Sequence, residues 1–184
     1  MHFPSLLAVA SAATAYAQCT AEQRLFFSNQ VPVAYSQKGP IATYTTFSKI
    51  PFGVGSLAGP CATVIYANGA PGIPVGLTGQ DVVTFGTTTR QAFFEVTGQY
   101  TDFPQNGTTL INTNVTLGVM SAISSGVTFA GQVYLDFNEA CRITAVRAFA
   151  QVPAFINGQP TDLGKILGIP KLPLPSIPFI PGQV

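Results

Sequence analysis

The chain has 184 residues, of which 47% are hydrophobic and only 8% are charged, with a formal net charge of +1. So weak a charge argues against partners such as nucleic acid or an anionic membrane surface, because both require a dense field of positive charge. The length and the apolar content predict instead one globular domain with its own core.

The first 17 residues have the pattern of a secretory signal peptide. An apolar run from Leu6 to Ala13 precedes the small-x-small sequence Ala15-Tyr16-Ala17. The run is too short to span a bilayer, and no later stretch reaches about 18 uninterrupted apolar residues. We therefore expect a secreted, extracellular protein without an integral membrane segment.

Cleavage of this peptide would remove His2, the only histidine of the chain. The mature protein would then lack every Ser-His-Asp or Cys-His nucleophile arrangement and every metal site that depends on imidazole. We expect neither a metal site nor a cofactor.

Export would also permit a disulfide among Cys19, Cys61 and Cys141, the three cysteines of the chain. They lie far apart without a C-x-x-C spacing, which argues against zinc and thioredoxin-type chemistry. One disulfide and one leftover thiol are expected, and sequence alone permits all three pairings. We favour Cys61 with Cys141 because both flank predicted strands, although Cys19, near the mature terminus, would also benefit from a tether.

The chain has two N-glycosylation sequons, which can be used only if it enters the secretory pathway. Asn106-Gly-Thr lies in a predicted turn, which should expose it. Asn114-Val-Thr lies within a predicted strand and is accessible only if its face points outward.

Helical signals come first in the mature chain. Thr20 and Gln23 fit a capping box at the start of a short helix, which Pro32 is expected to end. A further helical turn or short helix is expected between residues 41 and 47. Residues 79–86 fit either a short helix, with Asp81 in its first turn, or a strand.

Strand signals dominate the remainder. Residues 62–67 are β-branched and aromatic and end at the turn dipeptide Asn68-Gly69, so residues 73–77 could pair back against them. Further strands, most with the period of two that marks one buried face, are expected over residues 91–103, 109–119, 127–137 and 142–152. Short connections between these four segments predict a curved antiparallel sheet.

The tail differs in composition from the domain. Five prolines lie between Pro170 and Pro181, interleaved with leucine, isoleucine and phenylalanine. Because proline cannot donate to a strand ladder, we expect residues 153–184 to form an apolar, polyproline-II-like strap. Such a strap would pack along the domain or present a binding stretch to a partner.

This order of elements resembles the NTF2-like (SnoaL-like) cone, an α+β fold of short N-terminal helices and a curved antiparallel sheet. The hairpin Val127–Val152 is similar to the last two strands of that fold. The resemblance covers Thr20 to Val152, within an expected domain of residues 18–152. It implies a sheet wrapped around an apolar pocket, used for isomerase, cyclase or dehydratase chemistry or for binding alone. Members similar to scytalone dehydratase use histidine and aspartate there, and the mature chain would have no histidine. An all-β barrel of the lipocalin or dirigent type is the alternative, since alternation alone does not separate it from a cone.

The apolar face of the hairpin is the expected pocket wall, formed by Phe129, Val133, Leu135, Phe137 and Phe149. Asp102, two residues beyond Tyr100 on one face, and Arg147, two residues before Phe149, could share the pocket and orient a polar ligand group. Their ordinary interpretation is a solvated strand end for Asp102 and a surface side chain for Arg147.

Three classes of function are compatible with these features. We favour a non-enzymatic secreted protein that binds an apolar small molecule or acts at a cell surface or in a host. The alternative is a small lyase, isomerase or cyclase for a polyketide-like or terpenoid substrate, with Asp102 as base and Arg147 or Tyr100 as orienting group. The third is an interaction protein whose strap docks a partner. The sequence leaves both catalysis and oligomeric state open.

Overall fold

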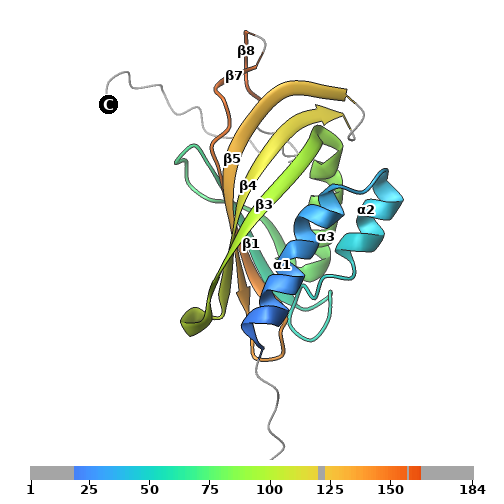
Figure 1. The fold of residues 1–184 in the computed structure, drawn as a ribbon, viewed down its shortest axis with the longest axis vertical. Helices are drawn as coiled ribbons and strands as arrows, with labels where there is room; N and C mark the ends of the chain where they lie inside the picture. The colour runs from blue at the N-terminus through green and yellow to red at the C-terminus, as the bar shows by residue number, and fades with distance from the viewer. Residues whose placement is uncertain (1–18, 120–122, 157, 163–184) are drawn as a thin grey trace, which may run out of the picture.

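A six-stranded sheet curved around three helices organises the part of the chain that the computed structural model describes, residues 19–119, 123–156 and 158–162 (Figure 1). The expected signal peptide and the Pro170–Pro181 stretch lie outside these residues. The helices are α1 (Ala21–Tyr35), α2 (Pro40–Phe47) and α3 (Gly79–Thr89), with short 3-10 turns at Arg90–Ala92 and Pro104–Asn106. The strands are β1 (Pro60–Ala67), β2 (Ile73–Thr78), β3 (Phe93–Phe103), β4 (Thr108–Val119), β5 (Ile123–Phe137), β6 (Ile143–Ala150) and a separate pair, β7 (Phe155–Ile156) and β8 (Gln159–Pro160).

Helix α1 begins at the predicted capping box and continues past the predicted end. Thr20 Oγ1 accepts the Gln23 backbone N–H at 3.3 Å, and Gln23 Oε1 accepts the Thr20 backbone N–H at 3.0 Å. The prediction that Pro32 ends the helix is wrong, because the ladder resumes with the Ser36 N–H donating to the Pro32 carbonyl. Pro32 is buried beside Gly98 of β3, so packing on the sheet offsets the backbone bond that proline cannot make.

The segment that fitted either helix or strand is helix α3. Thr78 Oγ1 accepts the Asp81 N–H, while the Asp81 carboxylate accepts the N–H groups of Leu77 and Thr78, each at 2.9 Å. These two backbone hydrogen bonds hold the pKa of Asp81 below its ordinary value. The capping box therefore fixes the point where β2 turns into α3.

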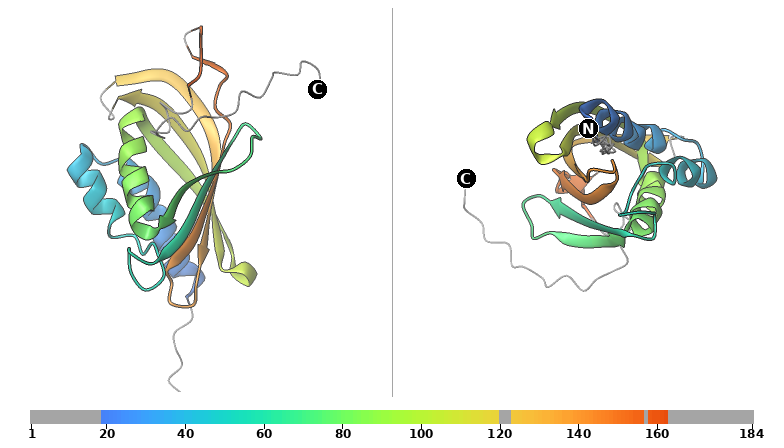
Figure 2. Two further views of the ribbon diagram at one scale, coloured as in Figure 1. Left: turned by 180° about the vertical axis from the view of Figure 1, so that it is seen from behind. Right: turned by 90° about the horizontal axis from the view of Figure 1, so that it is seen from below.

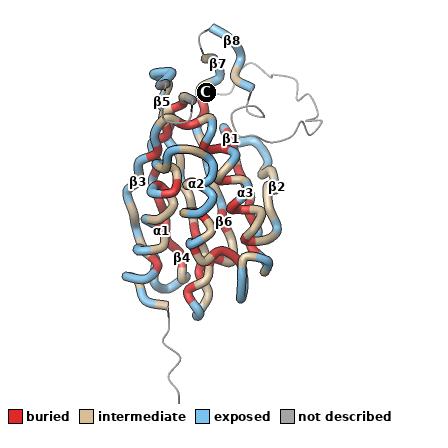
Figure 3. The backbone as a smooth tube through the Cα atoms, turned by 90° about the vertical axis from the view of Figure 1, so that its right-hand side faces the viewer, coloured by how far each residue is buried: buried red, intermediate tan, exposed pale blue. Residues whose placement is uncertain are grey.

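The sheet order is β2-β1-β6-β5-β4-β3. The four long strands β3 to β6 are consecutive antiparallel neighbours, as predicted, and β2 pairs back on β1. The purely antiparallel expectation is wrong at one place, because β1 pairs with β6 in parallel and makes the sheet mixed. Seen from the helix side, β3 and β2 lie at opposite sides with the helices between them (Figure 3). The sheet is thus an open cone, and the closed barrel is wrong.

The strand register sorts residues into rows across the sheet, and the rows facing the helices form the core. Rows of large side chains, such as Val96 with Val115 and Phe129, alternate with a row of small ones. That row comprises Gly98, Thr113, Gly131, Ala150 and Ala67. With so few side-chain atoms, it cannot fill the space under the helices, which cover only this face of the curved sheet (Figure 2).

Candidate functional site

A cavity lies over the row of small residues, between the sheet and helices α1 and α3. It has a larger compartment of about 100 Å³ and a neighbouring one of about 80 Å³. Residues that line both compartments come from α1, β1, α3, β5 and β6, and are Val31, Tyr35, Ile65, Phe85, Val133 and Ala148. The shared lining makes the two compartments parts of one site.

The cavity wall is almost entirely apolar. Among its described lining residues, the side-chain polar atoms are the hydroxyls of Tyr35, Thr89 and Thr113 in the larger compartment and of Tyr35 and Thr63 in the smaller. No charged side chain is part of either described lining. The cavity is therefore suited to an apolar guest with few polar atoms.

Tyr35 and Thr89 form a hydrogen-bonded pair of hydroxyls in this wall. Their hydroxyl oxygens are 3.0 Å apart, and the Thr89 hydroxyl lies within hydrogen-bond distance of the Phe85 and Gly86 carbonyls. Either hydroxyl can donate in this pair; when Thr89 donates to a carbonyl, Tyr35 donates to Thr89 and its own oxygen can accept from a guest. Burial raises the pKa of Tyr35, so its hydroxyl is neutral.

Only some of the residues that were predicted to form the pocket wall line the cavity. Phe129 lines the larger compartment, Leu135 the smaller, and Val133 both, whereas Phe137 is buried in the core beside them. Phe149 borders the larger compartment, but its ring faces outward. The register pairs Phe149 with Gln132 on the outer face. The residue is 40% exposed, and its ring stacks on that of Tyr66 at 4.6 Å between centroids.

Asp102 points inward but is already bound to a residue that was not among the predicted site residues, Arg24 of α1. Arg24 Nε donates to Asp102 Oδ1 at 2.8 Å and Nη2 to Oδ2 at 2.6 Å, and Thr109 adds a bond of 3.1 Å to Oδ1. The Arg24 side chain is 6% exposed and that of Asp102 is 8% exposed. The Arg24 guanidinium holds the pKa of Asp102 below its ordinary value, so the carboxylate is charged and engaged.

The other two candidates lie elsewhere. Arg147 is on the outer face, where Nη2 donates to the Asp136 carboxylate at 2.8 and 3.0 Å and the guanidinium lies over the Tyr134 ring. The Tyr100 hydroxyl donates to Asn29 Oδ1 at 2.9 Å. The structure thus puts Asp102 and Arg147 on opposite faces of the sheet, and the predicted carboxylate–arginine pair in the pocket is not formed.

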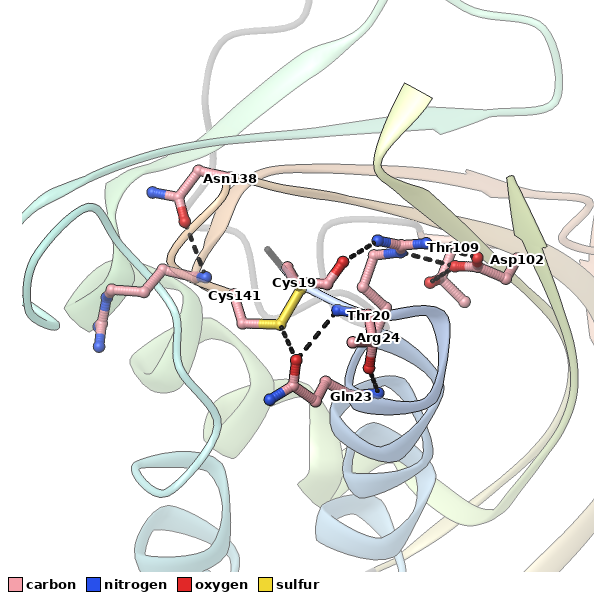
Figure 4. The surroundings of a disulfide bond; sticks show 9 residues. Cys19, Thr20, Gln23, Arg24, Asp102, Thr109, Asn138 and Cys141 are labelled. Atoms are coloured by element: carbon pink, nitrogen blue, oxygen red, sulfur yellow. Dashed lines mark hydrogen bonds and ion pairs between the residues drawn. A yellow bond between two sulfur atoms is a disulfide. The ribbon is translucent and has the colours of Figure 1, made fainter. Parts of the chain in front are cut away.

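The disulfide anchors the start of α1 next to the Arg24–Asp102 pair (Figure 4). It joins Cys19 to Cys141, and Arg24 Nη1 also donates to the Cys19 carbonyl at 2.6 Å. The predicted Cys61–Cys141 pairing is wrong: Cys61 is free, 0% exposed and part of the core. Its position on β1 buries it among apolar side chains, whereas Cys141 lies in the β5–β6 turn that reaches the N-terminus of α1. Burial raises the pKa of the Cys61 thiol.

The described ranges contain neither a metal cluster nor a membrane-spanning helix. Within them, no group of three or more histidine, cysteine, aspartate or glutamate side chains could hold a metal ion. Nor does any helix there have the length and apolar character needed to cross a membrane.

Comparison with known proteins agrees with the fold. The chain is similar to a steroid delta-isomerase from Pseudomonas aeruginosa, with a TM-score of 0.50 and 11% identity, covering 79% of this chain and 89% of that one. It is also similar to the BvnE pinacolase from Penicillium brevicompactum, with a TM-score of 0.46 and 14% identity over 71% of this chain and 84% of that one. For a SnoaL-like family protein from Agrobacterium tumefaciens the TM-score is 0.44 and the identity 14%, over 71% and 98% of the two chains. No family model and no curated protein matches the sequence. The described fold is the NTF2-like (SnoaL-like) cone that the order of elements indicated.

Proposed function

We propose that this NTF2-like cone is an exported binding protein, whose cavity takes a compact apolar molecule and does not transform it. The observation that carries the proposal is the cavity wall, which is apolar except for a few hydroxyls. Export is supported by the leader-like sequence of residues 1–17, and the Cys19–Cys141 disulfide is compatible with an oxidising compartment.

The volume limits the size of the guest. Apolar cavities of about 150 Å³ stay dry and bind benzene, whereas drug-sized ligands occupy about 300–1,000 Å³. Compartments of about 100 and 80 Å³ therefore suit a small ring or a short branched chain. The Tyr35 hydroxyl, which can both donate and accept, favours a guest that carries one hydroxyl group, such as a phenol or a small terpenoid alcohol.

The alternative, a lyase or isomerase for polyketide-like or terpenoid substrates, has less support from the same site. Proton transfer needs a group that can change its charge near neutral pH. The described cavity lining offers only hydroxyls, and burial makes that of Tyr35 harder to ionise. Asp102, the base predicted for this reaction, has both carboxylate oxygens bound to Arg24.

Calorimetric titration with phenol and with benzene tests the proposal. Ala148→Leu adds three carbon atoms at the boundary of both compartments and should abolish the binding of both probes. Ala62→Leu, on the exposed outer face of β1, is the matched control and should leave binding unchanged. Tyr35→Phe should weaken phenol about fivefold through one lost hydrogen bond and leave benzene unaffected. Equal binding by the Ala148→Leu and Ala62→Leu variants would contradict the proposal.

A further inference from the structure

The outer face of the sheet carries a second hollow, a groove of about 530 Å³ across β3 to β6. Amide and hydroxyl side chains dominate its wall, and no charged side chain is among the described residues that line it. Those that point outward by the strand register are Thr97, Gln99, Asn112, Asn114 and Gln132. Gln151, just beyond β6, is exposed in the same wall, and the Phe149 ring lies at one end.

Asn114, the asparagine of a sequon, stands inside this groove. Its neighbours in the same row are Thr97 on β3 and Ala130 on β5, and Ala130 is followed across the sheet by Gln151. Because the side chain of Ala130 is a single methyl group, it leaves space beside Asn114 on the outer face of the sheet. The Asn114 side chain is exposed, so the condition that the sequence set for this sequon, an outward face, is met.

The groove wall is chemically complementary to an N-acetylhexosamine. Asparagine and glutamine side chains both donate and accept, as hydroxyl and acetamido groups require. A sugar ring also has an apolar face, which packs on an aromatic ring, and the partly exposed Phe149 is held in place by its stack on Tyr66. Phe149 lies two strands from Asn114 and one row away, about 10 Å across the sheet and about 7 Å along it.

We propose that Asn114 carries an N-linked glycan whose first N-acetylglucosamine units lie in this groove and contact Phe149. In the attachment step, the bond between sugar C1 and a polyprenyl diphosphate donor breaks and a bond from C1 to Asn114 Nδ2 forms. The amide loses one proton and the polyprenyl diphosphate leaves. The proposal rests on the export that is part of the proposed function.

The test uses the full chain produced in a glycosylating eukaryotic secretory host. Peptide mass analysis should find Asn114 occupied. Phe149→Ala should lower the melting temperature of the glycosylated protein more than it lowers that of the Asn114→Gln variant, because the sugar contact exists only in the former. In the Asn106→Gln background, which removes the sequon of the Pro104–Asn106 turn, the Phe149→Ala effect should be the same as in the parent.

Each contrary outcome identifies a different error. A chain that stays inside the cell with residues 1–17 attached removes the export premise, and with it this proposal. A secreted chain with Asn114 unoccupied overturns the glycan while leaving export intact. An occupied Asn114 with equal Phe149→Ala effects in all backgrounds shows that the sugars do not lie in the groove. Self-association of the Asn114-unoccupied parent, or its binding of free chitobiose, assigns the groove to a second copy or to a separate carbohydrate.

Discussion

The Arg24–Asp102 pair should be one of the strongest single contributors to the stability of the cone. Arg24→Met removes the two guanidinium hydrogen bonds to Asp102 and the one to the Cys19 carbonyl, and it leaves the Asp102 carboxylate, 8% exposed, with Thr109 as its remaining side-chain partner. Removing one member of a buried pair costs about 3–5 kcal/mol, which for a domain of this size lowers the melting temperature by about 10 °C. Urea unfolding at pH 7, with the disulfide intact, measures the loss.

The outer face supplies a matched control. Arg147 and Asp136 form a comparable pair on the same sheet, but their side chains are 44% and 28% exposed. Arg147→Met should therefore cost no more than about 1 kcal/mol. The double variant Arg24→Met with Asp102→Leu, which buries no lone charge, should recover much of the single-variant loss. Equal losses for Arg24→Met and Arg147→Met would show that burial does not increase the contribution of the Arg24–Asp102 pair.

The same pair predicts how stability depends on pH. Because Arg24 lowers the pKa of Asp102 in the folded chain, the unfolded chain binds the proton more readily. The stabilisation is therefore complete above the ordinary carboxyl pKa of about 3.9 and is lost as the pH falls through the lower folded value. Asp102→Asn should flatten the acid side of the stability curve, and an unchanged slope below about pH 4 would contradict this assignment.

The remaining predictions concern the cysteines and a helix cap. Native protein should not react with a thiol reagent and should release one thiol, Cys61, only on denaturation; a reactive native thiol would show that Cys61 is accessible. Reducing Cys19–Cys141, whose partners are 122 residues apart, should destabilise the chain by up to about 5 kcal/mol in chemical unfolding, and no change would contradict the anchoring role. Thr78→Ala should cost about 1 kcal/mol through the lost cap, whereas Thr84→Ala, exposed within α3, should be nearly neutral; equal effects would reject the capping box.

The elements were readable from the sequence where a local signal was strong. The period of two placed β3 to β6, and the box formed by Thr20 and Gln23 placed the start of α1. The helix end predicted at Pro32 was wrong because burial of Pro32 against Gly98, a contact between distant segments, overrides the helix-breaking propensity of proline.

The faces of β6 were not readable in the same way. Ile143 and Val146 are both buried although they are three residues apart, because the register shifts between Asp136 and Phe137 on the partner strand. Apolar residues therefore occur on both faces of β6, and alternation does not reveal that Arg147 and Phe149 point outward.

The cavity and the disulfide depend on long-range pairing. The row of small residues joins Gly98, Gly131 and Ala150, which lie on three strands, so no single stretch of sequence shows it. A sequence hint for Arg24 is its spacing of four residues from Ser28, which puts both residues on one face of a helix. The structure buries both of them on the face of α1 that packs on the sheet.

The most direct test of the binding site is a crystal structure of the full chain equilibrated with 4-bromophenol. One anomalous bromine peak is expected beneath α1 and α3, bounded by Val133 and Ala148, with the phenol oxygen beside the Tyr35 hydroxyl. Bromine found only on the surface, with the compartments between helices and sheet empty or closed, would contradict this expectation.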